Sequence, residues 1–167
     1  MDERILGIDP GSSRIGYGLI EGRGDNWRLL TFGVWELAER NASEKLASLA
    51  AYLSAFLKEY TPSRAGLEKL YFSKNRKTAL GVAHARGVIA LILQTHGVPT
   101  IELEPSEIKL AVTGYGRADK RAVARMVERL LGARGGRYDD ATDALATALA
   151  ASGKARSVMH SFIHKAH

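Results

Sequence analysis

Cysteine is absent from this 167-residue sequence, and proline occurs only four times. Without cysteine the chain has no disulfides and no thiolate metal sites, which is compatible with a reducing cytoplasm. The longest apolar run, residues 87–93, is far shorter than the roughly 20 residues that span a bilayer. Residues 1–4 lead directly into an apolar strand, so we expect no signal peptide and no membrane partner.

Basic residues outnumber acidic ones, 24 to 18, which gives a net charge of +6 and a pI of about 9.7. A small protein this basic often binds a polyanion, most commonly nucleic acid. The basic residues are clustered in three groups: Lys69, Lys74, Arg76 and Lys77; Arg117, Lys120, Arg121 and Arg125; Arg129, Arg134 and Arg137. This clustering favours a surface that binds nucleic acid over a basic surface that only keeps the protein soluble.

The hydrophobic pattern predicts a single α/β domain with one mixed five-stranded sheet and helices on both faces. Three antiparallel strands come first, ending near residue 37, and two further strands are predicted at 64–68 and 100–103. Helices are predicted at 41–60, 77–96, 105–112, 119–132 and 139–151. We assign residues 1–152 to the domain and 153–167 to a basic tail, expected to be frayed.

The helix predicted at 77–96 is apolar on all sides between residues 88 and 93. A helix of this kind must be buried on more than one side, which in a chain this small indicates a subunit interface as well as a core. Five small residues on the helix would let another backbone approach closely: Ala79, Gly81, Ala83, Ala85 and Gly87. We therefore expect a homodimer.

Asp9 ends the first apolar strand, just before the turn at Pro10 and Gly11. In one interpretation the side chain bonds nearby backbone amides in an Asx turn. In the other it is a metal ligand, because a carboxylate at the end of a buried strand is costly unless a cation or several donors satisfy it. The second interpretation requires further carboxylates.

Such carboxylates occur at Glu68, which ends a later strand, and at the start of the last helix. Asp140 and Asp143 share a helix face, and the helix is apolar enough to lie against the sheet, whereas Asp139 is interpreted as favourable charge in a first helical turn. Two carboxylates about 4 Å apart repel by roughly 4 kcal/mol at an effective dielectric near 20. A divalent cation removes this repulsion, and hard oxygen ligands select Mg²⁺ or Mn²⁺.

The motifs, taken together, resemble the RuvC family of bacterial Holliday junction resolvases. The resemblance covers residues 5–151 and rests on LGIDPGS at 6–12, GYG at 16–18, LE at 67–68, KN at 74–75, ARG at 85–87 and DATDAL at 140–145. It implies a ribonuclease H-like fold, a homodimer, paired symmetric nicks in four-way DNA junctions, and a branch-migration complex of the RuvA and RuvB type as partner.

By position, the resemblance implies that four acids are catalytic and bind two Mg²⁺ ions, with Mn²⁺ able to substitute: Asp9, Glu68, Asp140 and Asp143. Asp139 is a neighbouring carboxylate that could take the place of Asp140. The DNA-binding residues are expected to be Tyr71, Lys74, Asn75, Arg76, Lys109 and Lys120. Tyr71, rather than Phe72, matches the aromatic that stacks on an unpaired base, a contact worth about 1–3 kcal/mol.

Two other function classes remain open at this point. An actin-like phosphotransferase also begins with a turn of this type, but it needs two domains and a second phosphate loop, for which the chain is too short. The other class is a DNA-binding module in which the acids have a purely structural role. Metal-dependent nicking of a four-way junction separates the three.

Overall fold

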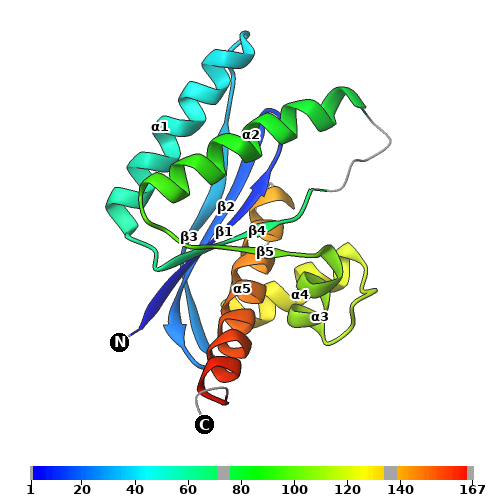
Figure 1. The fold of residues 1–167 in the computed structure, drawn as a ribbon. Coiled ribbons are helices and arrows are strands. Elements are labelled where there is room, and N and C mark those ends of the chain that lie inside the picture. Colours follow the sequence, from blue (N-terminus) through cyan, green and yellow to red (C-terminus); the bar gives the residue numbers. More distant parts are fainter. Residues whose placement is uncertain (1, 71–75, 134–138, 165–167) are drawn as a thin grey trace.

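The computed structural model describes residues 2–70, 76–133 and 139–164, and only the backbone of residues 76, 77 and 154–164. The described chain forms one sheet with the strand order β3-β2-β1-β4-β5 and helices on both of its faces (Figure 1). The strands are β1 (Glu3–Pro10), β2 (Arg14–Arg23), β3 (Asn26–Glu36), β4 (Arg64–Glu68) and β5 (Thr100–Leu103). The helices are α1 (Ala42–Tyr60), α2 (Arg76–Thr95), α3 (Pro105–Thr113), α4 (Lys120–Leu131) and α5 (Asp139–His164).

The sheet is mixed, as predicted. β1, β2 and β3 pair antiparallel, while β4 pairs parallel to β1, and β5 pairs parallel to β4. β1 lies at the centre, and its residues 5–8 are all buried. This burial on both faces explains why β1 is a continuous apolar run rather than an alternating one.

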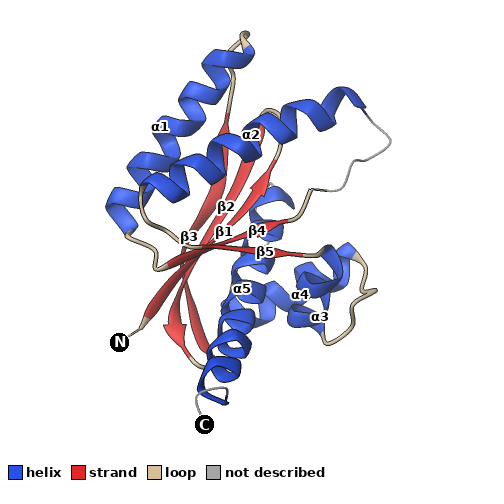
Figure 2. Ribbon diagram, in the orientation of Figure 1, coloured by secondary structure: helices blue, strands red, loops and turns tan. Residues whose placement is uncertain are grey.

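Alternate side chains of the strands divide between two cores, one on each face of the sheet. Leu6 and Ile8 pack with α1 and α2, whereas Ile5 and Ile20 pack with α3, α4 and α5. Figure 2 shows the same two layers around the strands. The period of two along a strand therefore decides which helices each side chain contacts.

The face of the sheet under α5 is built from glycine. A side chain at Gly7 would overlap the backbone of Ala144, and one at Gly16 would overlap the backbone of Asp140. Gly66 likewise lies against α5, where an added Cβ would come within 2.8 Å of the Ala151 Cβ. Because these positions carry no side chain, an alanine-rich helix can lie almost directly on the strands.

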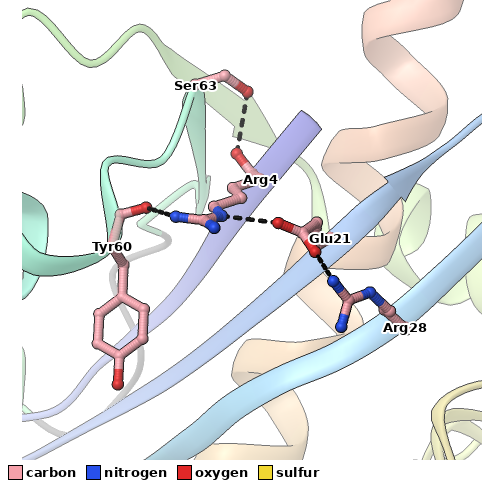
Figure 3. Close-up of polar contacts among 5 residues, drawn as sticks. All are labelled: Arg4, Glu21, Arg28, Tyr60 and Ser63. Atoms are coloured by element: carbon pink, nitrogen blue, oxygen red, sulfur yellow. Dashed lines mark hydrogen bonds and ion pairs between the residues drawn. The ribbon is translucent and has the colours of Figure 1, made fainter. Parts of the chain in front are cut away.

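Near the amino-terminal end of β1, an ion-pair network connects β1, β2 and β3 to the end of α1 (Figure 3). Arg4 donates from Nε to Glu21 Oε1 at 2.8 Å and from Nη1 to the Tyr60 carbonyl at 2.9 Å, and Arg28 pairs with the same Glu21. Ser63 donates its hydroxyl to the Arg4 carbonyl at 2.9 Å. The two arginines hold the pKa of the buried Glu21 carboxyl below its usual range, so this network has a structural role.

Helix ends follow the predicted signals. The Asn41 side chain accepts from the Ser43 N–H at the start of α1, and Asp119 caps α4 by accepting from the Ala122 N–H. The end predicted for the last helix was wrong, because α5 continues to His164 instead of ending near Ala151. The start of the proposed tail, residues 153–164, is therefore helical.

Within one chain, α2 is buried on its core side only, and the expected burial of a further side by a subunit interface stays a prediction. Ile89 and Leu93 are core residues, but Leu91 is 61% exposed. Of the small residues, Ala85 is buried in the core and Gly81 lies close to Ser12 of the same chain. By length and mean hydropathy the segment Thr78–Thr95 could cross a membrane. One such helix is weak evidence for a span, and here its inner face is part of the core.

Because the glycines leave no room between the strands and α5, one added methyl group at such a position should lower the stability of the fold considerably. Gly7→Ala should lower the free energy of unfolding by about 1–3 kcal/mol or more, because the Cβ would push α5 off the strand. Gly153→Ala is the matched control: it lies on α5 with nothing near its Cβ position, so it should stabilise by up to about 1 kcal/mol. Urea unfolding measures both, and an equally stable Gly7→Ala would contradict the close contact.

Candidate active site

Strand periodicity places Asp9 and Glu68 on the same face of the sheet. Gly7 and Gly66 are direct register partners in the parallel pair of β1 and β4, and both lie under α5. Asp9 and Glu68 each follow two residues later, so each lies on the α5 face at the carboxyl end of its strand. The repeated pattern of a glycine two residues before an acid was the sequence signal for this arrangement, and it was overlooked in the interpretation of the sequence alone.

Asp140 and Asp143 lie in the first turns of α5. Figure 1 shows that this end of α5 lies beside the carboxyl end of β1. The contact between Gly16 and the Asp140 backbone fixes this position, because Gly16 is the register partner of Asp9. One turn further along α5, Thr147 donates its hydroxyl to the Asp143 carbonyl at 2.9 Å. The structure thus brings the four predicted acids to one edge.

The electrostatics of Asp9 reflect this crowding. Burial is the main cause that raises the pKa of Asp9 from 3.8 to about 7, followed by the charges of Asp143, Asp140 and Glu68. Lys120 acts in the opposite direction without cancelling the shift. Burial and the neighbouring carboxylates together therefore disfavour the charged form of Asp9.

The neighbouring acids show the same effect more weakly. Burial, then the charge of Asp143, raises the pKa of Glu68, and Lys109 opposes the shift. Burial also raises the pKa of Asp143, against the hydrogen bond and charge of Lys120. Lys109 and Lys120 thus both lower the pKa of neighbouring acids in the site.

Two basic side chains form ion pairs with the acids of α5. Lys120 Nζ lies 3.0 Å from Asp143 Oδ2 and 3.5 Å from Asp139 Oδ2. Arg14 Nε lies 3.2 Å from Asp140 Oδ2. The Asp139 side chain is 83% exposed and that of Asp140 only 26%. Asp140 is thus the less exposed of the two acids, and its charge is among those that raise the pKa of Asp9.

Two recesses meet at Glu68. The first, of about 220 Å³, is lined by Asp9, Glu68 and Arg86 among others. The second, of about 310 Å³, is lined by Glu68, Lys109, Lys120 and Asp143 with apolar residues of α3, α4 and α5.

Arg86 donates to the Glu68 carbonyl at 3.4 Å and pairs with Glu102 at 2.6 Å. It thereby holds the end of β4 against β5.

The donor set fits a divalent cation of the Mg²⁺ type. Its side chains offer hard carboxylate oxygens, and the raised pKa values of Asp9, Glu68 and Asp143 indicate negative charge that a cation would relieve. Among the described residues, no three acids or histidines already surround one point closely enough to hold an ion. Instead, Lys120 pairs with Asp143 and Arg14 pairs with Asp140.

The remaining predicted site residues are placed only in part. Lys109 and Lys120 line the larger recess beside the acids. Tyr71, Lys74 and Asn75 lie outside the described residues, and Arg76 is described only as the first backbone position of α2. Arg14 was missed, and no sequence signal indicated it, because its contact with Asp140 depends on how α5 packs on β2.

Comparison with known proteins gives a consistent result. A family model described as crossover junction endodeoxyribonuclease RuvC matches residues 5–151. The RuvC protein of Petrotoga mobilis is 44% identical over 146 residues, which is 86% of this chain and 90% of that protein. The RuvC protein of Moorella thermoacetica is 44% identical over 147 residues, covering 87% of this chain and 88% of the relative.

Solved structures agree with the sequence match. T. thermophilus RuvC in complex with a Holliday junction substrate superimposes with a TM-score of 0.86 at 30% identity, covering 93% of this chain and 96% of that one. A yeast mitochondrial Holliday junction resolvase, at 19% identity, shares the fold with a TM-score of 0.62, covering 90% of this chain and 77% of that one. On the strength of the family match and these identities, the chain belongs to the RuvC family of crossover junction endodeoxyribonucleases.

Proposed function

We propose that this protein is a Mg²⁺-dependent endonuclease that resolves four-way DNA junctions by paired symmetric nicks, in DNA recombination and repair. The observation that carries the proposal is the meeting of Asp9, Glu68, Asp140 and Asp143 at one sheet edge, with a pKa near 7 at Asp9. The T. thermophilus relative is described in complex with a Holliday junction, which supports the same class of substrate.

In the proposed mechanism the four carboxylates hold two Mg²⁺ ions, with Mn²⁺ as a substitute. When bound, such a pair supplies an activated water and stabilises the leaving oxygen of an in-line displacement at phosphorus. Asp9 and Glu68 are fixed by rigid strands, while Asp140 and Asp143 are fixed by the contact of α5 with the sheet. Lys109 and Lys120, which line the adjoining recess, are placed to contact the phosphate next to the cut.

The remaining DNA contacts are assigned to residues 71–76, the segment that leads into α2 and includes its first residue. Tyr71 is proposed to stack on an unpaired base at the junction centre, with Lys74, Asn75 and Arg76 on the flanking backbone. Phosphate contacts of this kind position the DNA, whereas unstacking at the junction selects its structure. The proposed location is the cytoplasm, with a branch-migration complex of the RuvA and RuvB type as the working partner.

A homodimer would present two such sites to the two strands that are cut. The contact surface proposed is a groove of about 450 Å³ between α1 and α2, lined mostly by apolar side chains that include Leu46, Val88 and Leu91. An unpartnered apolar face with Leu91 61% exposed is costly in water. A second copy of the chain would cover it.

The first test compares the wild type with Asp9→Asn on a four-way junction. The variant should lose Mg²⁺-dependent nicking by at least about 100-fold, because it removes a ligand from the centre of the acid cluster. Junction binding in EDTA should be kept or strengthened, since a negative charge facing phosphates is removed. Gel assays of nicking and fluorescence anisotropy measure the two effects.

Duplex DNA and an RNA–DNA hybrid serve as control substrates, and Glu128→Gln serves as the control variant because this exposed acid of α4 lies outside the acid cluster. Equal cutting of the control substrates would contradict junction specificity. Cutting that persists in chelator would contradict metal dependence.

The pKa of Asp9 predicts a pH-dependent stability that the metal should remove. A carboxyl with a pKa near 7 in the folded state and 3.8 when unfolded stabilises the fold below about pH 4 and loses this contribution as the pH rises through 7. In EDTA at pH 8, Asp9→Asn should therefore be more stable than the wild type by about 2–4 kcal/mol. At pH 4 the two should be similar.

Mg²⁺ at pH 8 should raise the melting temperature of the wild type much more than that of Asp9→Asn. Thermal unfolding with and without the ion measures this directly, without any catalytic assay. A wild type whose stability is indifferent to Mg²⁺ would contradict a metal site at Asp9.

The proposed dimer predicts that Ala83→Arg, within the groove between α1 and α2, produces monomers, because a buried unpaired charge would cost several kcal/mol. Sedimentation velocity measures the change, with Ala51→Arg on the exposed part of α1 as the control. An unchanged sedimentation profile for Ala83→Arg would place the interface elsewhere.

A further inference from the structure

Arg14 is the first residue of β2, and its Nε lies 3.2 Å from Asp140 Oδ2. The Arg14 side chain is 53% exposed and that of Asp140 is 26% exposed. The guanidinium therefore lies at the boundary between the acid cluster and solvent. It has room to move outward without disturbing the core.

The register of the fold fixes this pair. Gly16, two residues along β2 from Arg14, lies directly under the Asp140 backbone. β2 thus contacts Asp140 at two positions. At Gly16 the lack of a side chain lets the two backbones approach closely, and at Arg14 the long side chain reaches the carboxylate. Since residues two apart share a strand face, the second contact follows from the first.

The pair has an electrostatic consequence for the proposed metal site. Asp140 is one of the acids that raise the pKa of Asp9, so it belongs to the same charge cluster. A divalent cation bound to these carboxylates would repel a guanidinium held 3.2 Å from one of them. The cation and the Arg14 contact therefore compete for the Asp140 carboxylate.

We propose that Arg14 is a positioning residue that exchanges partners: it holds Asp140 in the metal-free protein and moves to a DNA phosphate when a divalent cation takes the carboxylate. This inference rests on the proposed function, because it presumes a cation at the acids and DNA beside them. A positively charged side chain suits both partners, since it forms charge-assisted hydrogen bonds with carboxylate and phosphate alike.

The exchange makes cation binding and DNA binding cooperative. The cation releases Arg14 for a phosphate, and a phosphate that draws Arg14 away leaves Asp140 open to the cation. By thermodynamic linkage each ligand must then raise the affinity for the other by the same factor. Without the Arg14 charge, this part of the coupling disappears.

The test uses the full-length protein with Ca²⁺, which takes the same hard oxygen ligands as Mg²⁺. Calorimetric titration without DNA should show Ca²⁺ binding about fivefold or more tighter in Arg14→Gln than in the wild type, because the competing charge is gone. The change from EDTA to Ca²⁺ should tighten junction binding several-fold in the wild type and distinctly less in Arg14→Gln. Anisotropy measures the second effect, with a gel to check that the DNA is intact.

Two further variants separate charge from packing. Arg14→Lys keeps the positive charge and should bind Ca²⁺ as the wild type does. Arg23→Gln removes an exposed arginine at the far end of the same strand, about 30 Å away, and should change neither measurement. Both variants and Arg14→Gln should melt at similar temperatures.

The proposal is overturned if Arg14→Gln binds Ca²⁺ no more tightly than the wild type, or if its junction binding gains as much from Ca²⁺. It is also overturned if Arg14→Lys behaves like Arg14→Gln. The proposed nuclease function fails by a different result, the absence of Mg²⁺-dependent nicking by the wild type, so the two failures are distinguishable.

Discussion

The contact on which the structure depends most is that between α5 and the glycine positions of the central strands. A helix is normally held away from a sheet by the side chains of both elements. Here Gly7, Gly16 and Gly66 remove the side chains from one partner, and the alanines of α5 reduce them on the other. The helix therefore comes close enough for its first turns to share an edge of the sheet with the ends of β1 and β4.

This contact explains why four carboxylates can be held together despite their repulsion. The cost appears at Asp9, whose pKa is raised to about 7 by burial and by the other three acids. Packing of α5 against the sheet, with its large buried apolar surface, holds the acids in place against this repulsion. Lys120 and Arg14 offset part of the charge from the rim of the site, and a divalent cation would offset the rest.

The two faces of the sheet serve different purposes. The α5 face carries the acids and the basic side chains of α3 and α4, and it is where the proposed chemistry occurs. The opposite face carries α1 and α2, whose outer apolar surface is suited to a second copy of the chain. The Arg4–Glu21–Arg28 network lies at the end of the sheet away from the acids, where it fixes the end of α1.

The sequence by itself determined the order of strands and helices and the caps at Asn41 and Asp119, because these depend on local pattern, and it predicted the four acids by motif resemblance. Only the tertiary structure showed that Asp140 is less exposed than Asp139 and pairs with Arg14 of β2, because both acids lie in one helical turn and their surroundings depend on packing. It also revealed Arg14, whose partner lies 126 positions further along the chain. The exposed side of α2 could not be predicted either, because an all-apolar helix does not indicate which of its faces meets the core and which meets solvent.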